Sequence, residues 1–159
     1  MLKPWVSNYQ PHLHDPETIK KYANKIQVLL QQIGEDPQEQ FKLAKVELPL
    51  EINVKVWIVN GGYVRDNIPG GLEFIVGGHG YVYDFIPKDE IWMDDDAAED
   101  EFIYDLMHEF YERPLMKAGY EYSVAHERAS EFELIARKDP SKALSQLLIA
   151  MKKNVENPK

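Results

Sequence analysis

Apolar residues near the start of the chain repeat at the spacing of an amphipathic helix. Between positions 16 and 33 they recur every three or four residues, which puts them on one helix face: Ile19, Tyr22, Ile26, Leu29, Leu30 and Ile33. Asp15-Pro16 suits the start of such a helix, and Gly34 suits its end. Asp36-Pro37 predicts a shorter second helix that runs to about Lys45.

The middle of the chain changes to a pattern that favours strands. Residues 52–59 are rich in β-branched side chains and predict a strand that ends at a turn, Asn60-Gly61-Gly62. Residues 72–76 and 81–86 predict two more strands, joined as a hairpin by Gly77-Gly78-His79-Gly80. Residues 90–94 predict a short fourth strand.

Helical spacing returns after the fourth predicted strand. Asp96 and Glu99 fit a capping box, so we expect a helix from Ala97 to about Glu112 or beyond. Its apolar stripe consists of Phe102, Ile103, Leu106, Met107 and Phe110. Pro114 should kink or end this helix because proline has no backbone N–H to donate.

Two further helices follow. Gly119 closes the region after Pro114, and Ser123 is expected to cap a helix that reaches about Arg137. Asp139-Pro140 predicts the start of a last helix. The order of helix, strands and helices predicts an α+β fold, with a small sheet of three to four strands, an N-terminal helix and two to three C-terminal helices.

No internal repeat or low-complexity linker divides the chain, so we expect one domain over residues 1–159. Its expected parts are an N-terminal helical part (1–50), a sheet (52–94), two helices (97–137) and a C-terminal helix (140–155).

The charge of the chain narrows the classes of partner. Lys and Arg number 18 against 27 Asp and Glu, for a net charge of -9. The segment from Asp89 to Glu112 contains eleven of the acidic residues and no Lys or Arg. Because nucleic-acid phosphates and anionic lipids both attract basic surfaces, we expect neither nucleic acid nor a membrane as a partner. The acidic segment is where we look for function.

The absence of cysteine limits the kinds of metal and catalytic site, and the apolar content bears on the compartment of the protein. The chain has no cysteine, which excludes disulfides, thiolate metal sites and cysteine nucleophiles. Its N-terminus lacks the apolar core of a signal peptide, and its longest apolar runs, such as residues 147–151, are too short to span a bilayer. We therefore expect a cytoplasmic protein.

Two helix faces carry side chains suited to a metal ion. At about 100° per residue, Asp105, His108 and Glu112 share a sector opposite the apolar stripe, together with Glu101. On the following helix His126 and Glu133 share a sector beside three alanines, whose small side chains let another backbone come close.

A short connection between these helices can bring His108, Glu112, His126 and Glu133 together. Imidazole nitrogen with carboxylate oxygen suits zinc, and also manganese or iron. Glu133 can equally orient an imidazole or pair with Arg137. A His and a Glu four residues apart also occur as a solvated surface pair, which leaves the metal site as one of two interpretations.

The segment His108-Glu109-Phe110-Tyr111-Glu112 resembles a variant of the His-Glu-x-x-His motif of zincin metallopeptidases. The order of strand, motif-bearing helix and second helix is also similar to a zincin. Residues 54–133 resemble an uncharacterised prokaryotic and phage family that combines Ile-Trp-x-Asp, His-Glu-x-x-Glu-Arg and Ala-His-x-x-Ala.

The resemblance to gluzincins implies roles for these residues. It makes His108 and Glu112 paired ligands of a divalent metal, zinc above all, and Glu109 the base that activates water. His126 or Glu133 becomes the distal ligand. The function implied is metal-dependent hydrolysis, most simply of a peptide or protein.

The oxyanion of such a reaction needs a hydrogen-bond donor. The sequence offers His79, Tyr111 and Tyr122, together with Tyr120, and does not choose among them. Glu112 stands where the motif has its second His. This added carboxylate lowers the positive charge of the site and weakens its hydrolytic power.

A second hypothesis is a non-enzymatic module of phage or mobile-element origin that binds a metal or a basic protein partner through its acidic face. The sequence indicates no oligomeric state. We expect Asp94-Asp95-Asp96 to serve a helix N-terminus, where carboxylates are favoured, and not to bind a cation.

Overall fold

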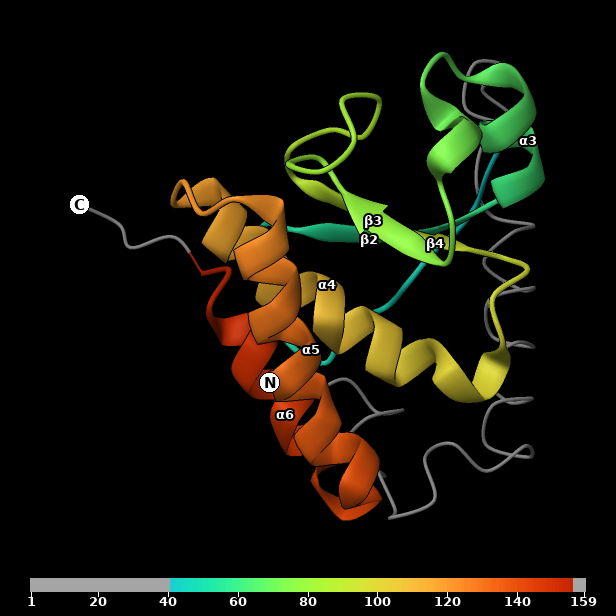
Figure 1. Cartoon of the computed structure of the whole chain (residues 1–159). Helices are drawn as coiled ribbons and strands as arrows, with labels where there is room; N and C mark the ends of the chain where they lie inside the picture. The colour runs from blue at the N-terminus through green and yellow to red at the C-terminus, as the bar shows by residue number, and fades with distance from the viewer. Residues whose placement is uncertain (1–40, 156–159) are drawn as a thin grey trace.

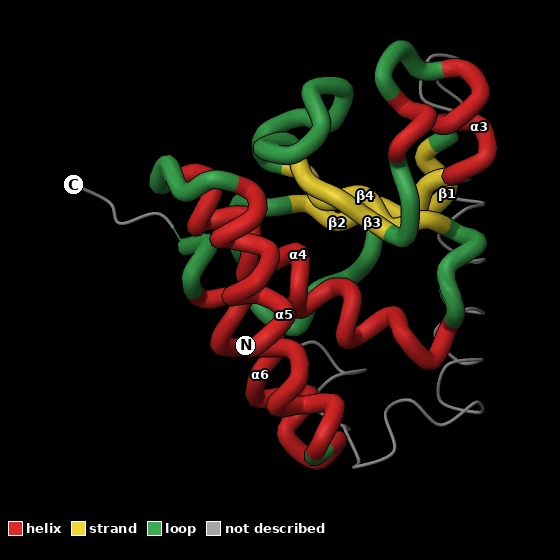
Figure 2. The backbone as a smooth tube through the Cα atoms, in the orientation of Figure 1, coloured by secondary structure: helices red, strands yellow, loops and turns green. Residues whose placement is uncertain are grey.

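The computed structural model of the chain describes residues 41–155, which contain one mixed sheet of four strands in the order β1-β2-β4-β3 (Figures 1 and 2). β1 (Lys42–Lys45) is antiparallel to β2 (Lys55–Val59), which is parallel to β4 (Glu90–Asp94). β3 (Gly77–His79) is antiparallel to β4 and forms one edge of the sheet.

Residues 41–155 hold four α-helices: α3 (Gly61–Asn67), α4 (Phe102–Lys117), α5 (Tyr122–Lys138) and α6 (Ala143–Lys152). α4, α5 and α6 gather below the sheet in the view of Figure 1, whereas α3 lies at the opposite corner. The predicted α+β class is therefore confirmed for this part of the chain. None of these helices has the length and apolar character needed to cross a membrane.

Successive side chains of a strand point to opposite faces of the sheet, and the two faces of β2 contribute to two separate apolar clusters. On β2, Val56 and Ile58 belong to the larger cluster, which includes buried residues of α4 and α6. Val59 of β2 belongs to the smaller cluster, with Trp92 of β4 and Val64 of α3. The larger cluster therefore fixes the position of α4 against the sheet.

α4 continues through Pro114 to Lys117, so this proline does not end the helix. Pro114 cannot donate to the carbonyl of Phe110, four residues earlier. The side chain of Asn154 replaces this bond, because its Nδ2 donates to Phe110 O at 2.7 Å. A residue beyond the last helix thus repairs the hydrogen bonding of α4.

Several predicted elements differ in the structure. Residues 42–45 form β1 and not the end of a helix, since they pair with β2. Asn60 caps α3 by accepting a hydrogen bond from Tyr63 N, so the expected turn at 60–62 begins a helix. The hairpin expected over 72–86 is wrong: its supposed turn contains β3, and a short 3₁₀ helix covers Gly71–Glu73.

Other predicted boundaries shift by a few residues. The predicted strand 90–94 is confirmed as β4. α4, the helix that carries His108 and Glu112, starts later than expected, at Phe102. A 3₁₀ turn precedes it over Glu99–Glu101, and the side chain of Asp96 does not cap this turn. α5 begins at Tyr122 and not after Ser123. Asp139 accepts a hydrogen bond from Ser141 N before α6, as its Asp-Pro pattern predicts.

The predicted N-terminal helix, residues 16–33, lies outside the described residues, as does most of the expected N-terminal part. The division of the whole chain into one domain stays a prediction.

Candidate metal centre

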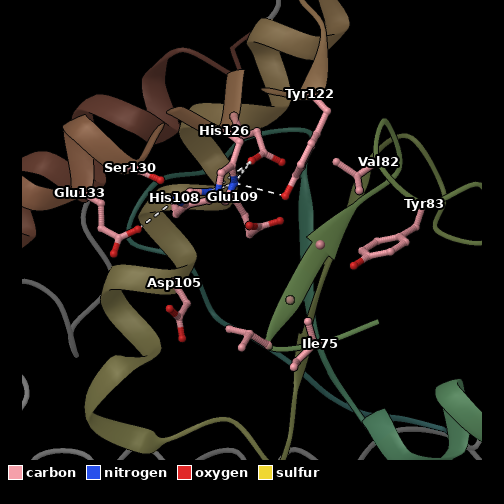
Figure 3. Close-up of a pocket in the computed structure, with 14 residues that line it drawn as sticks. Ile75, Val82, Tyr83, Asp105, His108, Glu109, Tyr122, His126, Ser130 and Glu133 are labelled. Atoms are coloured by element: carbon pink, nitrogen blue, oxygen red, sulfur yellow. Dashed lines mark hydrogen bonds and ion pairs between the residues drawn. The ribbon is translucent and has the colours of Figure 1, made fainter. Parts of the chain in front are cut away.

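Three side chains from α4 and α5 place one ligand atom each at the corners of a triangle. His108 Nε2 lies 3.1 Å from Glu112 Oε2 and 3.1 Å from His126 Nδ1. The third side, between His126 Nδ1 and Glu112 Oε2, is also 3.1 Å. His108 and Glu112 meet because they are four residues apart on α4, and His126 reaches them across the α4–α5 contact (Figure 3).

The α4–α5 contact is close because the alanines that the sequence places beside His126 are buried. Ala125, Ala129 and Ala136 are all fully inaccessible to solvent. Their small side chains allow the two helix backbones to approach, which the sequence pattern predicted. The approach puts His126 and Glu133 of α5 over the same face of α4.

The other nitrogen of His108 is oriented by Glu133. His108 Nδ1–H donates to Glu133 Oε1 at 2.9 Å, and Arg137 donates to the second oxygen of the same carboxylate. A neutral His108 with its proton on Nδ1 therefore turns the lone pair of Nε2 toward the triangle. This is the arrangement by which a carboxylate orients a metal-binding imidazole. Glu133 thus serves as the partner of His108 and Arg137, one of the roles the sequence left open.

His79 performs the matching task for Glu112. Its Nδ1 accepts the backbone N–H of Tyr81 at 3.2 Å, so in the neutral ring Nε2 carries the proton. Nε2–H donates to Glu112 Oε1 at 2.9 Å. This bond leaves Glu112 Oε2 directed at His108 and His126. His79 reaches the site from β3, is fully buried and is not among the described residues that line the cavity.

Hydrogen bonding and burial set the charges of the cluster. Burial alone would lower the pKa of His108, but hydrogen bonds to Glu112 and Glu133 outweigh it and raise that pKa to about 10. Burial would likewise raise the pKa of Glu112, but hydrogen bonds from His108 and His79 hold it well below its usual value. Burial lowers the pKa of His79. The triangle therefore combines an ionised carboxylate with a site on His108 that attracts a proton or another cation.

Glu109 lies beside the triangle without taking part in it. One of its carboxylate oxygens is within 4.8 Å of ligand atoms of His79 and Glu112. Burial raises the pKa of Glu109, and the neighbouring Glu112 carboxylate raises it further. A half-buried carboxylate whose pKa is shifted upward next to a cation site is suited to accept a proton from water.

The triangle opens into a cavity of about 320 Å³ between the helices and β3. His108, Glu109, Glu112, His126 and Glu133 all line it, together with Tyr122. The Tyr122 hydroxyl lies 3.3 Å from His126 Nδ1, and its ring stacks on that imidazole. Figure 3 shows Tyr122 beside His126, near Val82 of the β3 side. A hydroxyl in this position can donate to a group bound at the triangle.

Tyr111 is not among the described residues that line the cavity. Its ring stacks on Phe132 at 4.3 Å between centroids and packs against the larger apolar cluster. This placement follows from helix geometry, because Tyr111 is one residue, about 100°, away from Glu112. Of the oxyanion candidates His79, Tyr111, Tyr120 and Tyr122, only Tyr122 is among the described residues that line the cavity.

The remaining lining residues come from the segment around β3. They are Ile75, Val76, Gly77, Gly78, Val82 and Tyr83, and Asp105 of α4 and Ser130 of α5 complete the lining. No periodic pattern pointed to them, because an irregular segment has none. The Gly77-Gly78-His79 run did stand out in the sequence, but as a turn and not as a strand beside a cavity.

Asp94, Asp95 and Asp96 have other partners. Asp94 accepts a hydrogen bond from Arg65 at 2.6 Å, and Asp95 Oδ1 accepts one from Gly61 N, the first residue of α3. Of the three carboxylates only Asp95 bonds a helix N-terminus, that of α3, and no side chain caps the 3₁₀ turn or α4 that follow, so the expected role at the following helix is wrong. Ligand atoms of the three residues lie within 4.8 Å of one another.

The triangle meets the distance requirement of a metal site. Ligand atoms at about 2.0–2.1 Å from a tetrahedral zinc ion lie about 3.3 Å from one another. The three separations of 3.1 Å are close to this value. His108, Glu112 and His126 can therefore hold a metal ion with little movement.

His79, Glu109 and Glu112 form a second group with ligand atoms within 4.8 Å of one another. His79 fits a metal poorly, because the N–H of Tyr81 occupies its Nδ1 and leaves the proton on Nε2. A ligand imidazole needs the opposite arrangement, with Nε2 unprotonated. The triangle is therefore the better of the two cation sites.

Comparisons with protein families, with curated proteins and with solved structures found no match to this chain. The functional argument therefore rests on the residues and their geometry.

Proposed function

We propose that the protein is a metal-dependent hydrolase of zincin type, most simply a small metallopeptidase. In this proposal His108, Glu112 and His126 hold zinc, and Glu109 is the general base. The observation that carries the proposal is the triangle of ligand atoms, 3.1 Å on each side, with His108 oriented by Glu133.

The three 3.1 Å separations are also compatible with hydrogen bonds, with one proton on His108 or His126 in place of a metal ion. The outer partners favour a metal site, because they orient both His108 and Glu112. Glu133 directs the Nε2 lone pair of His108 inward, and His79 directs Glu112 Oε2 inward. Two oriented lone pairs that point at one place are the arrangement by which proteins prepare a cation site.

Zinc, when bound, supplies a Lewis acid that lowers the pKa of water and polarises a carbonyl. Glu109 contributes a carboxyl group that is protonated near neutral pH without a metal, because burial raises its pKa to about 8. A cation bound beside it would favour its ionised form, which can take a proton from water and pass it to a leaving group. Tyr122 contributes a hydroxyl beside His126 that can stabilise negative charge on a substrate oxygen.

The edge strand β3 supports a peptide as the substrate class. Asp94 N donates to Val76 O at 2.9 Å, so the hydrogen-bonded pairs of this antiparallel ladder fall on Val76 and Gly78. The carbonyl of Gly77, between them, therefore points away from β4. Gly77 also lines the cavity, where an extended peptide can add to the sheet as a further strand.

Metal analysis of the purified protein tests the cation site. We expect about one zinc per chain after zinc loading and dialysis, and a loss of that zinc in His108→Ala and His126→Ala. Glu127→Ala is the matched control, since Glu127 follows His126 on α5 and is likewise exposed but does not line the cavity. The same low zinc content in the wild type and in both histidine variants would overturn the proposal.

Hydrolysis is tested by Glu109→Gln, which keeps the shape of the side chain and removes its basicity. We expect peptide cleavage by the zinc-loaded wild type, and its loss in Glu109→Gln with zinc content unchanged. Zinc binding without any cleavage would favour the alternative function, a non-enzymatic metal-binding module. Glu112 gives that alternative a physical basis, because its negative charge reduces the Lewis acidity of the site.

A further inference from the structure

Apolar side chains are exposed in the segment that precedes β3. Leu72 is 80% exposed, Ile75 70% and Val76 39%. Ile75 and Val76 line the cavity, whereas Leu72 does not. Exposed apolar residues at the rim of a polar cavity are typical of a binding site.

Val76 has an unusual backbone conformation at the same place. Its φ of 65° lies in the left-handed region, which is unfavourable for a β-branched residue. Gly77 N–H donates to Ile75 O at 2.7 Å across it, and Asp94 N donates to Val76 O. These bonds hold a tight turn that directs Ile75 and Val76 out of the sheet. Backbone strain of this kind persists where the surrounding structure requires it, and it gathers at functional sites.

Val82 adds an apolar side chain on the β3 side of the cavity, at the other end of β3 from Ile75 (Figure 3). Figure 3 shows Val82 and Ile75 on this side, across from Tyr122 and Asp105 of the helices. We name Ile75, Val76 and Val82 the apolar rim. The outward carbonyl of Gly77 lies in the chain directly after the rim turn. A peptide paired with this edge therefore passes over the apolar rim.

The charges of the opposite wall narrow the occupant further. Four residues with carboxyl groups line the cavity, Asp105, Glu109, Glu112 and Glu133, and no Lys or Arg of the described residues does. Burial raises the pKa of Asp105 and Glu109, so the negative charge near neutral pH is carried by Glu112 and Glu133, whose pKa values are lowered by their hydrogen bonds. An acidic side chain next to the rim would meet repulsion. An apolar side chain gains contact with the rim and leaves the carboxylates and a bound cation undisturbed.

We propose that the apolar rim is a specificity subsite for a large apolar side chain, such as Leu or Phe, of an extended peptide bound along the edge of β3. This inference rests on the proposed function and names the residues that select its substrate. The strained turn at Val76 prepares the subsite, because Ile75 and Val76 face the cavity before any peptide binds.

Peptide binding to a protein that cannot hydrolyse tests the subsite separately from catalysis. The probes are fluorescein-labelled eight-residue peptides of Ala and Ser in which one central position is Leu, Lys or Glu. Their Kd values are measured by fluorescence anisotropy on zinc-loaded Glu109→Gln. We expect the Leu peptide to bind at least about 10-fold more tightly than the Glu peptide, the scale of one well-filled apolar contact.

Substitutions in the rim identify the residues responsible. Ile75→Ser and Val76→Gly, each added to Glu109→Gln, should remove most of the preference for Leu. Glycine keeps the left-handed conformation of position 76 and removes only the side chain. Leu72→Ser is the matched control, because Leu72 is exposed in the same segment but lies off the cavity. Zinc content should be the same in all three.

Separate outcomes distinguish the two proposals. Leu-selective binding that Ile75→Ser removes, with no cleavage by the wild type, would support the subsite and overturn the hydrolase. Cleavage by the wild type without Leu preference, or a preference that survives in Ile75→Ser and Val76→Gly, would overturn the subsite alone. Tighter binding of the Lys peptide would overturn the apolar specificity. A failure of all peptides to bind would overturn the subsite as well.

Discussion

Asn154 supplies the hydrogen bond that Pro114 removes from α4, and its replacement by alanine should destabilise the protein. Asn154 is 5% exposed. Its Nδ2 donates to Phe110 O at 2.7 Å and to Ala150 O at 2.9 Å, and its Oδ1 accepts from Arg113 Nη1 at 3.0 Å. Asn154→Ala removes all three bonds.

These bonds differ in what they contribute. Ala150 O keeps the backbone bond from Lys153 N, and Arg113 keeps two bonds to Lys88 O. The buried Phe110 carbonyl loses its replacement partner, which costs about 1–3 kcal/mol. With the weakened Arg113 contact we expect a total loss of about 3 kcal/mol, which lowers Tm by roughly 10 °C for a chain of this size.

A double-mutant cycle separates this cause from a general loss of packing. In the Asn154→Ala background, Pro114→Ala restores an N–H that can donate to Phe110 O, and should recover about 1 kcal/mol. In the wild type, Pro114→Ala should change stability less, since Asn154 already bonds that carbonyl. Urea unfolding followed by circular dichroism measures both. Additivity of the two substitutions within about 0.5 kcal/mol would refute the reasoning.

Two further predictions concern the metal centre. His79→Ala should weaken zinc binding by about 10- to 100-fold without abolishing it, because Glu112 loses the partner that orients it. Competition with a chelator measures the zinc affinity, and His79→Gln should restore part of it. Unchanged zinc affinity in His79→Ala would contradict the role assigned to His79. The second prediction is that zinc affinity rises with pH between about 6 and 9. The pKa of His108 is raised to about 10, so its proton stabilises the zinc-free fold fully below the unfolded value of about 6.5, and that stabilisation is lost as pH rises through about 10. Zinc must displace this proton. Titration calorimetry in buffers of different ionisation enthalpy should therefore detect about one proton released per zinc at pH 7. A zinc affinity that does not change with pH between about 6 and 9 would contradict the raised pKa of His108.

The helix faces of the site were predictable because they depend on local geometry. Residues four apart on a helix lie on the same face, so the pairing of His108 with Glu112 follows from the sequence once the helix is recognised. The buried alanines of α5 likewise indicated a close contact. The identity of the three triangle residues was therefore within reach of the sequence.

The elements around β3 were not predictable in the same way. Glycine has a low preference for strands, and the Gly77-Gly78-His79 run therefore resembles a turn. It forms a strand only because β4 lies beside it and supplies its hydrogen-bond partners. The continuation of α4 past Pro114 has a related cause, since Asn154, far along the chain, satisfies the carbonyl that Pro114 leaves free.

The sequence by itself determined the helical register that presents His108, Glu112 and His126, and it located the acidic segment that contains the first two. Tertiary structure alone decided which groups surround them. His79 meets Glu112 across 33 residues of sequence, and Glu133 meets His108 across 25. The contact of Glu133 with His108 was one of the roles that helix spacing left open, and the structure chose it. The contact of His79 with Glu112 depends on how β3 packs against α4, which residue spacing did not indicate.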